Sequence, residues 1–131
     1  MVEPAAIEPG GNASPKTILV CDDEPALREL VRAVLGGGYR FIEVDDGHQA
    51  LELARELRPD LLVLDLMLPG LTGLDVLAAI RSDEELRSLR VIVVSAWTHA
   101  AERALDVGAD RFMTKPFEPD DLSAAVEELL A

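Results

Sequence analysis

The stretch Leu61-Leu62-Val63-Leu64-Asp65-Leu66-Met67-Leu68-Pro69-Gly70 decides the fold of this chain. An apolar run of this length, ended by a Pro-Gly pair, is typical of a strand buried on both faces, as in a parallel sheet covered by helices. Asp65 lies at the carboxyl end of the run, where open parallel sheets bind their ligands. An isolated buried charge is strongly penalised unless it is paired, protonated or bound to a metal. Position alone leaves Asp65 open as either a site residue or the first residue of a loop.

The composition indicates one compact domain. The chain has 131 residues, of which 49% are hydrophobic and 28% charged, which suits a single core and leaves no room for a second sizeable domain. Asp and Glu number 25 against 12 Lys and Arg, giving a formal charge of -13. This charge repels nucleic acids and anionic membranes, so it argues against direct nucleic-acid binding by this chain.

The single Cys21 excludes an internal disulfide framework and is typical of a reducing compartment. The sequence also lacks an apolar run of transmembrane length and the basic, then apolar, start of a signal peptide. We therefore expect a cytoplasmic protein without membrane insertion.

Strand and helix patterns alternate five times along the chain. Residues 1–16 contain several Pro and Gly residues and little periodicity, which predicts a flexible N-terminal tail before a domain at 17–131. Strands are predicted at 17–21, 40–44, within 61–70, at 90–95 and at 111–114, and helices at 25–35, 50–57, 74–80, 101–107 and 119–130. This alternation predicts an α/β fold, a doubly wound parallel sheet with helices on both faces.

Polar side chains follow four of the five predicted strands. Asp22 and Asp23 follow the first, Asp65 ends the third, Ser95 ends the fourth, and Lys115 follows the fifth. A doubly wound sheet brings these strand ends to one edge. Three clustered carboxylates repel one another, so some must take up protons or the cluster must hold a cation. Oxygen ligands of this kind suit Mg²⁺ and a phosphate-bearing substrate.

This pattern resembles the receiver domain of two-component response regulators. The family has an acidic pair after strand one, an aspartate after strand three, Thr or Ser after strand four, and Lys-Pro after strand five. The surrounding sequences at 64–70, 108–110 and 115–117 match the family as well, and the resemblance covers roughly residues 17–130. It implies a flavodoxin-like (βα)5 sheet with strand order 2-1-3-4-5, and a cis peptide bond between Lys115 and Pro116.

The resemblance also implies a function. Asp65 would accept a phosphoryl group from a phosphohistidine of a histidine kinase or histidine phosphotransferase, as a carboxylate nucleophile. Asp23, Asp65 and the backbone carbonyl of Met67 would bind Mg²⁺ directly, and Asp22 would act through a metal-bound water. Lys115 would contact the phosphoryl oxygens as a point charge.

Further residues are implied in signalling and in the lifetime of the phosphoryl group. Ser95 would donate a hydrogen bond to the attached phosphoryl group and draw the following loop inward. Phe112 occupies the position of the family's aromatic switch, and lacks the hydroxyl that Tyr carries there. The face formed by the last two helices and the strand between them would then be recognised by a partner. Met67 and Trp97 lie two residues beyond Asp65 and Ser95, where the family tunes dephosphorylation, and the bulk of Trp97 predicts a slow loss of the phosphoryl group.

Other interpretations fit the residues less well. Such a domain is a phosphoacceptor that catalyses its own phosphorylation and dephosphorylation, and not a classical enzyme. A Mg²⁺-dependent phosphohydrolase with an aspartate nucleophile generally has an acid two residues after it, where this chain has Met67. A flavin-binding module would not place Asp22 and Asp23 against a phosphate, and a degenerate receiver would not need the complete site.

The family's DNA-binding branch commonly pairs symmetric dimers through basic residues on the last helix. Residues 119–130 contain no basic residue, so we expect no such dimer. The sequence leaves open a stand-alone receiver, similar to the chemotaxis regulators, or a fragment of a longer regulator, and we expect the first.

Overall fold

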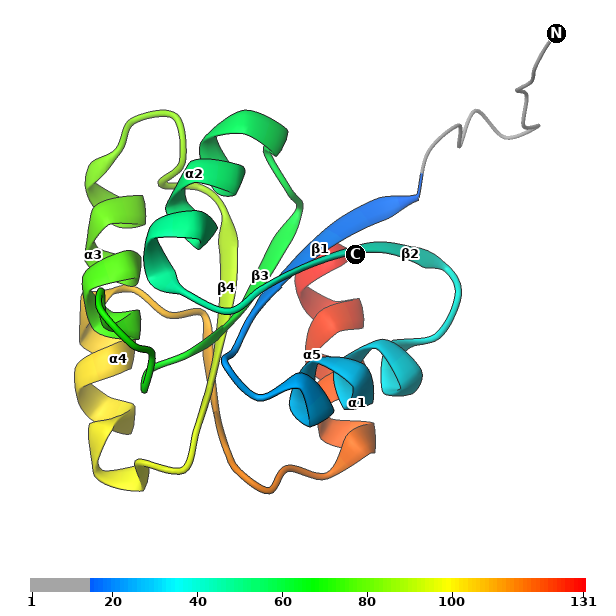
Figure 1. The fold of residues 1–131 in the computed structure, drawn as a ribbon. Helices are drawn as coiled ribbons and strands as arrows, with labels where there is room; N and C mark the ends of the chain where they lie inside the picture. Colours follow the sequence, from blue (N-terminus) through cyan, green and yellow to red (C-terminus); the bar gives the residue numbers. More distant parts are fainter. Residues whose placement is uncertain (1–14) are drawn as a thin grey trace, which may run out of the picture.

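The computed structural model describes residues 15–131 as one parallel sheet with helices on both faces (Figure 1). The five strands lie in the order β2-β1-β3-β4-β5, as the resemblance predicts. The elements, in chain order, are β1 (Lys16–Cys21), α1 (Pro25–Leu35), β2 (Tyr39–Val44), α2 (Gly47–Leu57), β3 (Leu61–Asp65), α3 (Gly73–Ser82), β4 (Arg90–Ser95), a 3-10 turn (Thr98–Ala100), α4 (Ala101–Val107), β5 (Arg111–Thr114) and α5 (Pro119–Leu130).

The sheet divides the core into two layers. Alternate residues of the central strands point to opposite faces, so Leu62 and Leu64 face the layer covered by α2, α3 and α4. Leu61 and Val63 face the layer covered by α1 and α5. All five residues of β3 are buried, which explains why its sequence is apolar throughout and not alternating.

The helix boundaries follow from local chemistry. Pro25 lies in the first turn of α1, and Gly36 ends that helix with φ +80°, a conformation that favours glycine. The side chains of Asp46 and Thr72 accept hydrogen bonds from backbone N–H groups at the starts of α2 and α3. Both helices therefore begin before the first apolar residue that marked them in the sequence.

The predicted strands agree with the structure to within one residue at their amino ends. We predicted Lys16 to lie in the tail, but it is the first residue of β1. It pairs with Tyr39, which likewise begins β2 one residue before the predicted start. The rest of the predicted tail lies almost entirely outside the described residues. Within residues 15–131, no helix is both long and apolar enough to span a bilayer.

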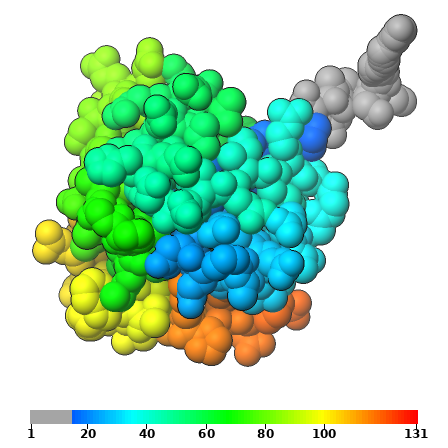
Figure 2. Space-filling model, viewed as in Figure 1, coloured from blue at the N-terminus to red at the C-terminus, as the bar shows by residue number. Residues whose placement is uncertain are grey.

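The carboxyl ends of the strands meet at one edge of the molecule. In Figure 2 the segments that follow β1 (blue), β3 (green), β4 (yellow) and β5 (orange) come together at the lower part of the view. The residues that follow these strands are the candidates identified in the sequence.

Candidate functional site

Asp65 lies at the end of β3 and is 4% exposed. Its Oδ1 accepts a hydrogen bond from the backbone N–H of Met67 at 3.1 Å. Gly73, at the start of α3, packs against the same stretch of backbone. A Cβ at Gly73 would lie 2.3 Å from the carbonyl oxygen of Asp65, so only glycine lets α3 approach this closely.

Asp22 and Asp23 follow β1 and face Asp65. Asp22 is 1% exposed, whereas Asp23 is exposed. One Oδ of Asp22 accepts a hydrogen bond from the backbone N–H of Glu24 at 2.9 Å, and the Arg28 guanidinium donates to the Asp22 carbonyl oxygen at 2.6 Å. These bonds fix the loop that presents the acidic pair.

The three aspartates can together hold a cation. Asp22, Asp23 and Asp65 each offer a carboxylate oxygen, and these oxygens lie within 4.8 Å of one another. Such a set of hard anionic oxygens fits Mg²⁺, which prefers carboxylate and water ligands. One exposed and two buried ligands leave the site open to solvent on one side.

Lys115 reaches this cluster from the loop after β5. Its Nζ lies 2.9 Å from Asp22 Oδ2, 3.3 Å from Asp65 Oδ2 and 3.3 Å from Glu24 Oε1. The Lys115-Pro116 peptide bond is cis, as the resemblance predicts. The backbone N–H of Lys115 donates to the Ser95 carbonyl oxygen at 2.9 Å, which ties the loop after β5 to the end of β4.

The cluster shifts the ionisation of its members. Burial raises the pKa of Asp65, and the nearby charge of Asp22 adds to this, while the Met67 N–H and Lys115 oppose it. Burial alone would lower the pKa of Lys115, but its hydrogen bond to Asp22 and the charges of Asp22 and Asp65 raise it instead. At neutral pH the site therefore contains a charged lysine beside carboxylates of limited solvation.

Ser95 is the third buried polar residue at this edge of the sheet. Its Oγ accepts a hydrogen bond from the backbone N–H of Trp97 at 3.0 Å. Within residues 15–131 the Ser95 hydroxyl donates no hydrogen bond, so its hydrogen is available to a ligand. Trp97 and Met67 are 45% and 51% exposed, and both line an apolar groove of about 360 Å³ beside the site.

A family model described as "Response regulator receiver domain" matches residues 18–127. The chain belongs to this family. The receiver also resembles the DNA-binding response regulator MtrA of Mycolicibacterium smegmatis, with 43% identity over 86% of the chain and 50% of MtrA. It is 36% identical to the phosphate regulon regulator PhoB of Pseudomonas aeruginosa, over 88% of the chain and 52% of PhoB. The receiver thus spans about half the length of these curated relatives.

Solved structures have the same architecture. A putative response regulator from Chloroflexus aurantiacus aligns with a TM-score of 0.85 at 29% identity, over 89% of this chain and 98% of that one. The receiver domain of the sensor histidine kinase PA1611 from Pseudomonas aeruginosa aligns with a TM-score of 0.81, also at 29% identity and with the same coverage. Its structure is described as having a magnesium ion coordinated in the active-site cleft.

The fold brings the predicted residues of this receiver together at one edge. Asp22, Asp23, Asp65 and Lys115 form a single cluster, and Ser95 joins it through the backbone of Lys115. Phe112 lies farther along β5, partly buried against the layer that includes α4.

Two contributors to the site were not identified from the sequence. Glu24 shares the ammonium group of Lys115, and Gly73 admits α3 to the backbone of Asp65. The sequence carries no local signal for Gly73, because its role depends on the approach of α3 to the backbone of Asp65. Cys21 is buried, and burial raises the pKa of its thiol to about 12. The thiol therefore stays protonated and unreactive.

Proposed function

We propose that Asp65 accepts a phosphoryl group from a phosphohistidine of a histidine kinase or histidine phosphotransferase. The observation that carries this proposal is the convergence of three aspartates and Lys115 at the carboxyl end of β3. A carboxylate oxygen of Asp65 attacks the phosphorus, and the P–N bond to the partner's imidazole breaks. The electron pair of that bond leaves with the imidazole nitrogen, and Asp65 becomes an acyl phosphate.

Asp23 and Asp65 would hold Mg²⁺ directly, with the backbone carbonyl of Met67, and Asp22 would hold it through a water. The donor set supports this assignment, because the three carboxylates approach within 4.8 Å and the Met67 backbone is held beside Asp65 by its N–H bond. When bound, the ion offsets the negative charge that the phosphoryl group brings to an acidic cluster. Two residues after Asp65, where the phosphohydrolases generally have a second acid for the leaving group, this chain has Met67.

Lys115 positions and neutralises the phosphoryl group. Its ammonium already lies 3.3 Å from Asp65 Oδ2, so a short rotation carries it to a phosphoryl oxygen. Phosphoryl transfer depends mainly on positioning and charge neutralisation, which a lysine held between two carboxylates provides.

Ser95 and Phe112 form the switch. The free hydroxyl hydrogen of Ser95 binds the phosphoryl group, and the Trp97 N–H that now binds Ser95 Oγ moves with it. Movement of the loop after β4, which contains Trp97, changes the space beside α4, where Phe112 packs. Phosphorylation thereby biases an equilibrium between two conformations of the α4, β5 and α5 face, which a partner protein recognises.

Trp97 and Met67 control the lifetime of the acyl phosphate. Both side chains are about half exposed and line one apolar groove. They shield the phosphoryl group from water, so dephosphorylation is slow. The acidic surface of this chain repels DNA, and we assign it no direct contact with nucleic acid.

Trp97 fluorescence tests this function. The protein is titrated with Mg²⁺ and then with beryllofluoride, a phosphoryl mimic, alongside the Asp65→Asn variant. A response of the wild type to both ligands, with the beryllofluoride response lost in the variant, is expected. If the wild type and the variant respond alike to beryllofluoride, Asp65 is not the acceptor.

A further inference from the structure

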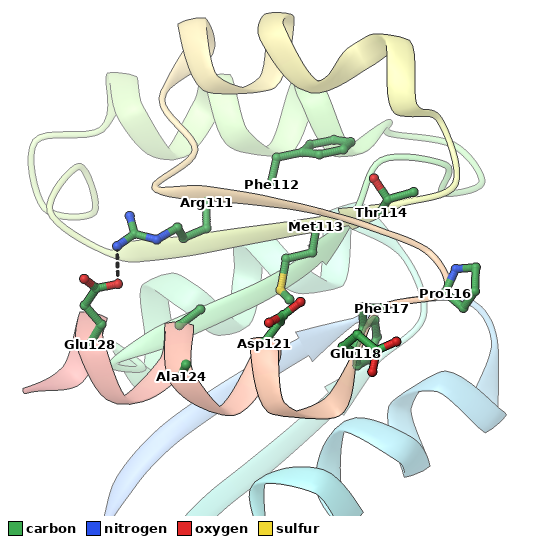
Figure 3. Close-up of a pocket in the computed structure, with 11 residues that line it drawn as sticks. Arg111, Phe112, Met113, Thr114, Pro116, Phe117, Glu118, Asp121, Ala124 and Glu128 are labelled. Atoms are coloured by element: carbon green, nitrogen blue, oxygen red, sulfur yellow. Dashed lines mark hydrogen bonds and ion pairs between the residues drawn. The ribbon is translucent and has the colours of Figure 1, made fainter.

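A groove of about 540 Å³ lies between β5 and α5, away from the acidic cluster (Figure 3). β5 is an edge strand that pairs only with β4 within the described residues, so its outer side faces the groove. In Figure 3 Met113 points from β5 toward α5, and Phe117 lies at one end of the groove. Ala124 and Ala125 of α5 have side chains too small to fill the space. The floor of the groove is therefore apolar and accessible.

The rim of the groove is acidic. Glu118, Asp121 and Glu128 line it against one cation, Arg111. The Arg111 guanidinium pairs with Glu128, as Figure 3 shows. Among residues 15–131, neither Glu118 nor Asp121 has a cationic partner. The whole segment 116–131 has five acidic residues and no basic one, so this face keeps a negative charge that the Arg111–Glu128 pair offsets only in part.

A second copy of the chain is a poor occupant. Two acidic α5 helices brought face to face would repel each other, and the single Arg111 on each copy is already paired. Like charges juxtaposed across an interface cost several kcal/mol, whereas opposite charges steer association and fix its orientation. The surface therefore favours a partner of opposite charge.

We propose that this groove binds a segment of another protein in which basic side chains flank an apolar anchor. The anchor lies on Met113 and Phe117, and the basic groups pair with Glu118 and Asp121. This assignment rests on the proposed function, since it names the chemistry of the partner that the switched face recognises. Strand β5 borders the groove, the side chain of Phe112 packs in the opposite layer with α4 (Figure 3), and the Lys115 N–H connects the end of β5 to Ser95. The groove and the phosphorylation site therefore share strand β5.

Nuclear magnetic resonance tests the groove residue by residue. The probe is a short synthetic peptide with two arginines on each side of a Leu-Phe pair, and its counterpart carries glutamate in place of each arginine. Both are titrated into the ¹⁵N-labelled protein with Mg²⁺ and beryllofluoride. The arginine peptide is expected to shift the signals of residues 111–118 and 121–128, and the glutamate peptide to shift none.

Two charge-matched variants separate the groove from general acidity. Glu118→Gln with Asp121→Asn removes two charges at the groove, and Glu52→Gln with Glu56→Gln removes two exposed charges on α2. The groove variant is expected to bind the arginine peptide roughly fivefold more weakly, the effect of losing two exposed ion pairs, and the α2 variant to bind it unchanged. Shifts spread over the surface, equal weakening in both variants, or no shifts with either peptide would overturn the proposal.

A portion of the same protein, without beryllofluoride, is treated with acetyl phosphate and Mg²⁺, and its intact mass is measured by mass spectrometry. A phosphorylated Asp65 with an empty groove would reject the basic partner and leave the phosphoacceptor function standing. Shifts confined to the groove in a protein that takes up no phosphoryl group would support the groove and reject the phosphoacceptor function.

Discussion

Replacing Lys115 with methionine should destabilise the protein strongly, and Mg²⁺ should reverse much of the loss. Lys115 Nζ lies 2.9 Å from Asp22 and 3.3 Å from Asp65, and both carboxylates are buried. Glu24, its third partner, is largely exposed and contributes little. Methionine keeps the length of the side chain and removes only the charge that these two carboxylates share.

Removing one partner of a buried ion pair costs about 3–5 kcal/mol, because an uncompensated charge stays behind. Lys115 is partly exposed, so we expect the lower end, about 3 kcal/mol. With a urea dependence of about 1.5 kcal/mol per molar, the unfolding midpoint falls by about 2 M. Mg²⁺ bound to the aspartates supplies the missing positive charge, so the deficit should shrink to less than half of this at saturating Mg²⁺.

Urea unfolding in EDTA and at saturating Mg²⁺ measures the two midpoint differences between Lys115→Met and the wild type. Lys16→Met is the matched control, because it removes the chain's other lysine from an exposed position, and its midpoint should change little in either buffer. A Lys115→Met midpoint within about 0.5 M of the wild type in EDTA, a margin of roughly 0.75 kcal/mol, would refute the role of Lys115 in neutralising these carboxylates. So would a deficit that Mg²⁺ leaves unchanged.

Three further outcomes are expected. Because burial raises the pKa of Asp65, ionised Asp65 weakens the fold above that pKa. In EDTA at neutral pH, Asp65→Asn should therefore unfold at a higher urea concentration than the wild type. This difference in midpoint should disappear as the pH falls toward 3.8, the ordinary pKa of aspartate. A difference that persists at pH 3.8 would contradict the prediction. Gly73→Ala should lower the free energy of unfolding by about 1–3 kcal/mol and weaken Mg²⁺ binding, because its Cβ would meet the Asp65 carbonyl at 2.3 Å. A Cβ at Gly37 meets nothing within 4 Å, so Gly37→Ala should match the wild type in both calorimetric unfolding and Mg²⁺ titration. Trp97→Ala should lose its phosphoryl group several-fold faster in a mass-spectrometric time course, whereas Leu105→Ala, an exposed apolar truncation on α4, should not; equal rates would refute shielding.

The fold and the polar strand ends could be predicted because both are local signals. The apolar run of β3 and the helical spacing that follows each strand determine the alternation, and the alternation determines which edge Asp22, Asp65 and Lys115 share. The first residue of β1 could not be predicted in this way, because Lys16 belongs to the sheet only through its pairing with Tyr39.

Other features depend on contacts between distant segments. Gly73 matters because α3 returns to the backbone of Asp65, and no local pattern encodes that approach. Glu24 directly precedes the predicted helix at 25–35, whereas the structure brings Lys115 to it across 91 residues. The groove between β5 and α5 likewise arises from small residues on the helix facing larger ones on an edge strand.

Phosphorylation of Asp65 is the central claim, and intact-mass spectrometry tests it most directly. The protein is incubated with acetyl phosphate and Mg²⁺, with parallel samples in EDTA and of Asp65→Asn. The wild type in Mg²⁺ should gain the mass of one phosphoryl group, and neither control should. A wild type that gains no mass, or an Asp65→Asn variant that gains as much as the wild type, would contradict the claim.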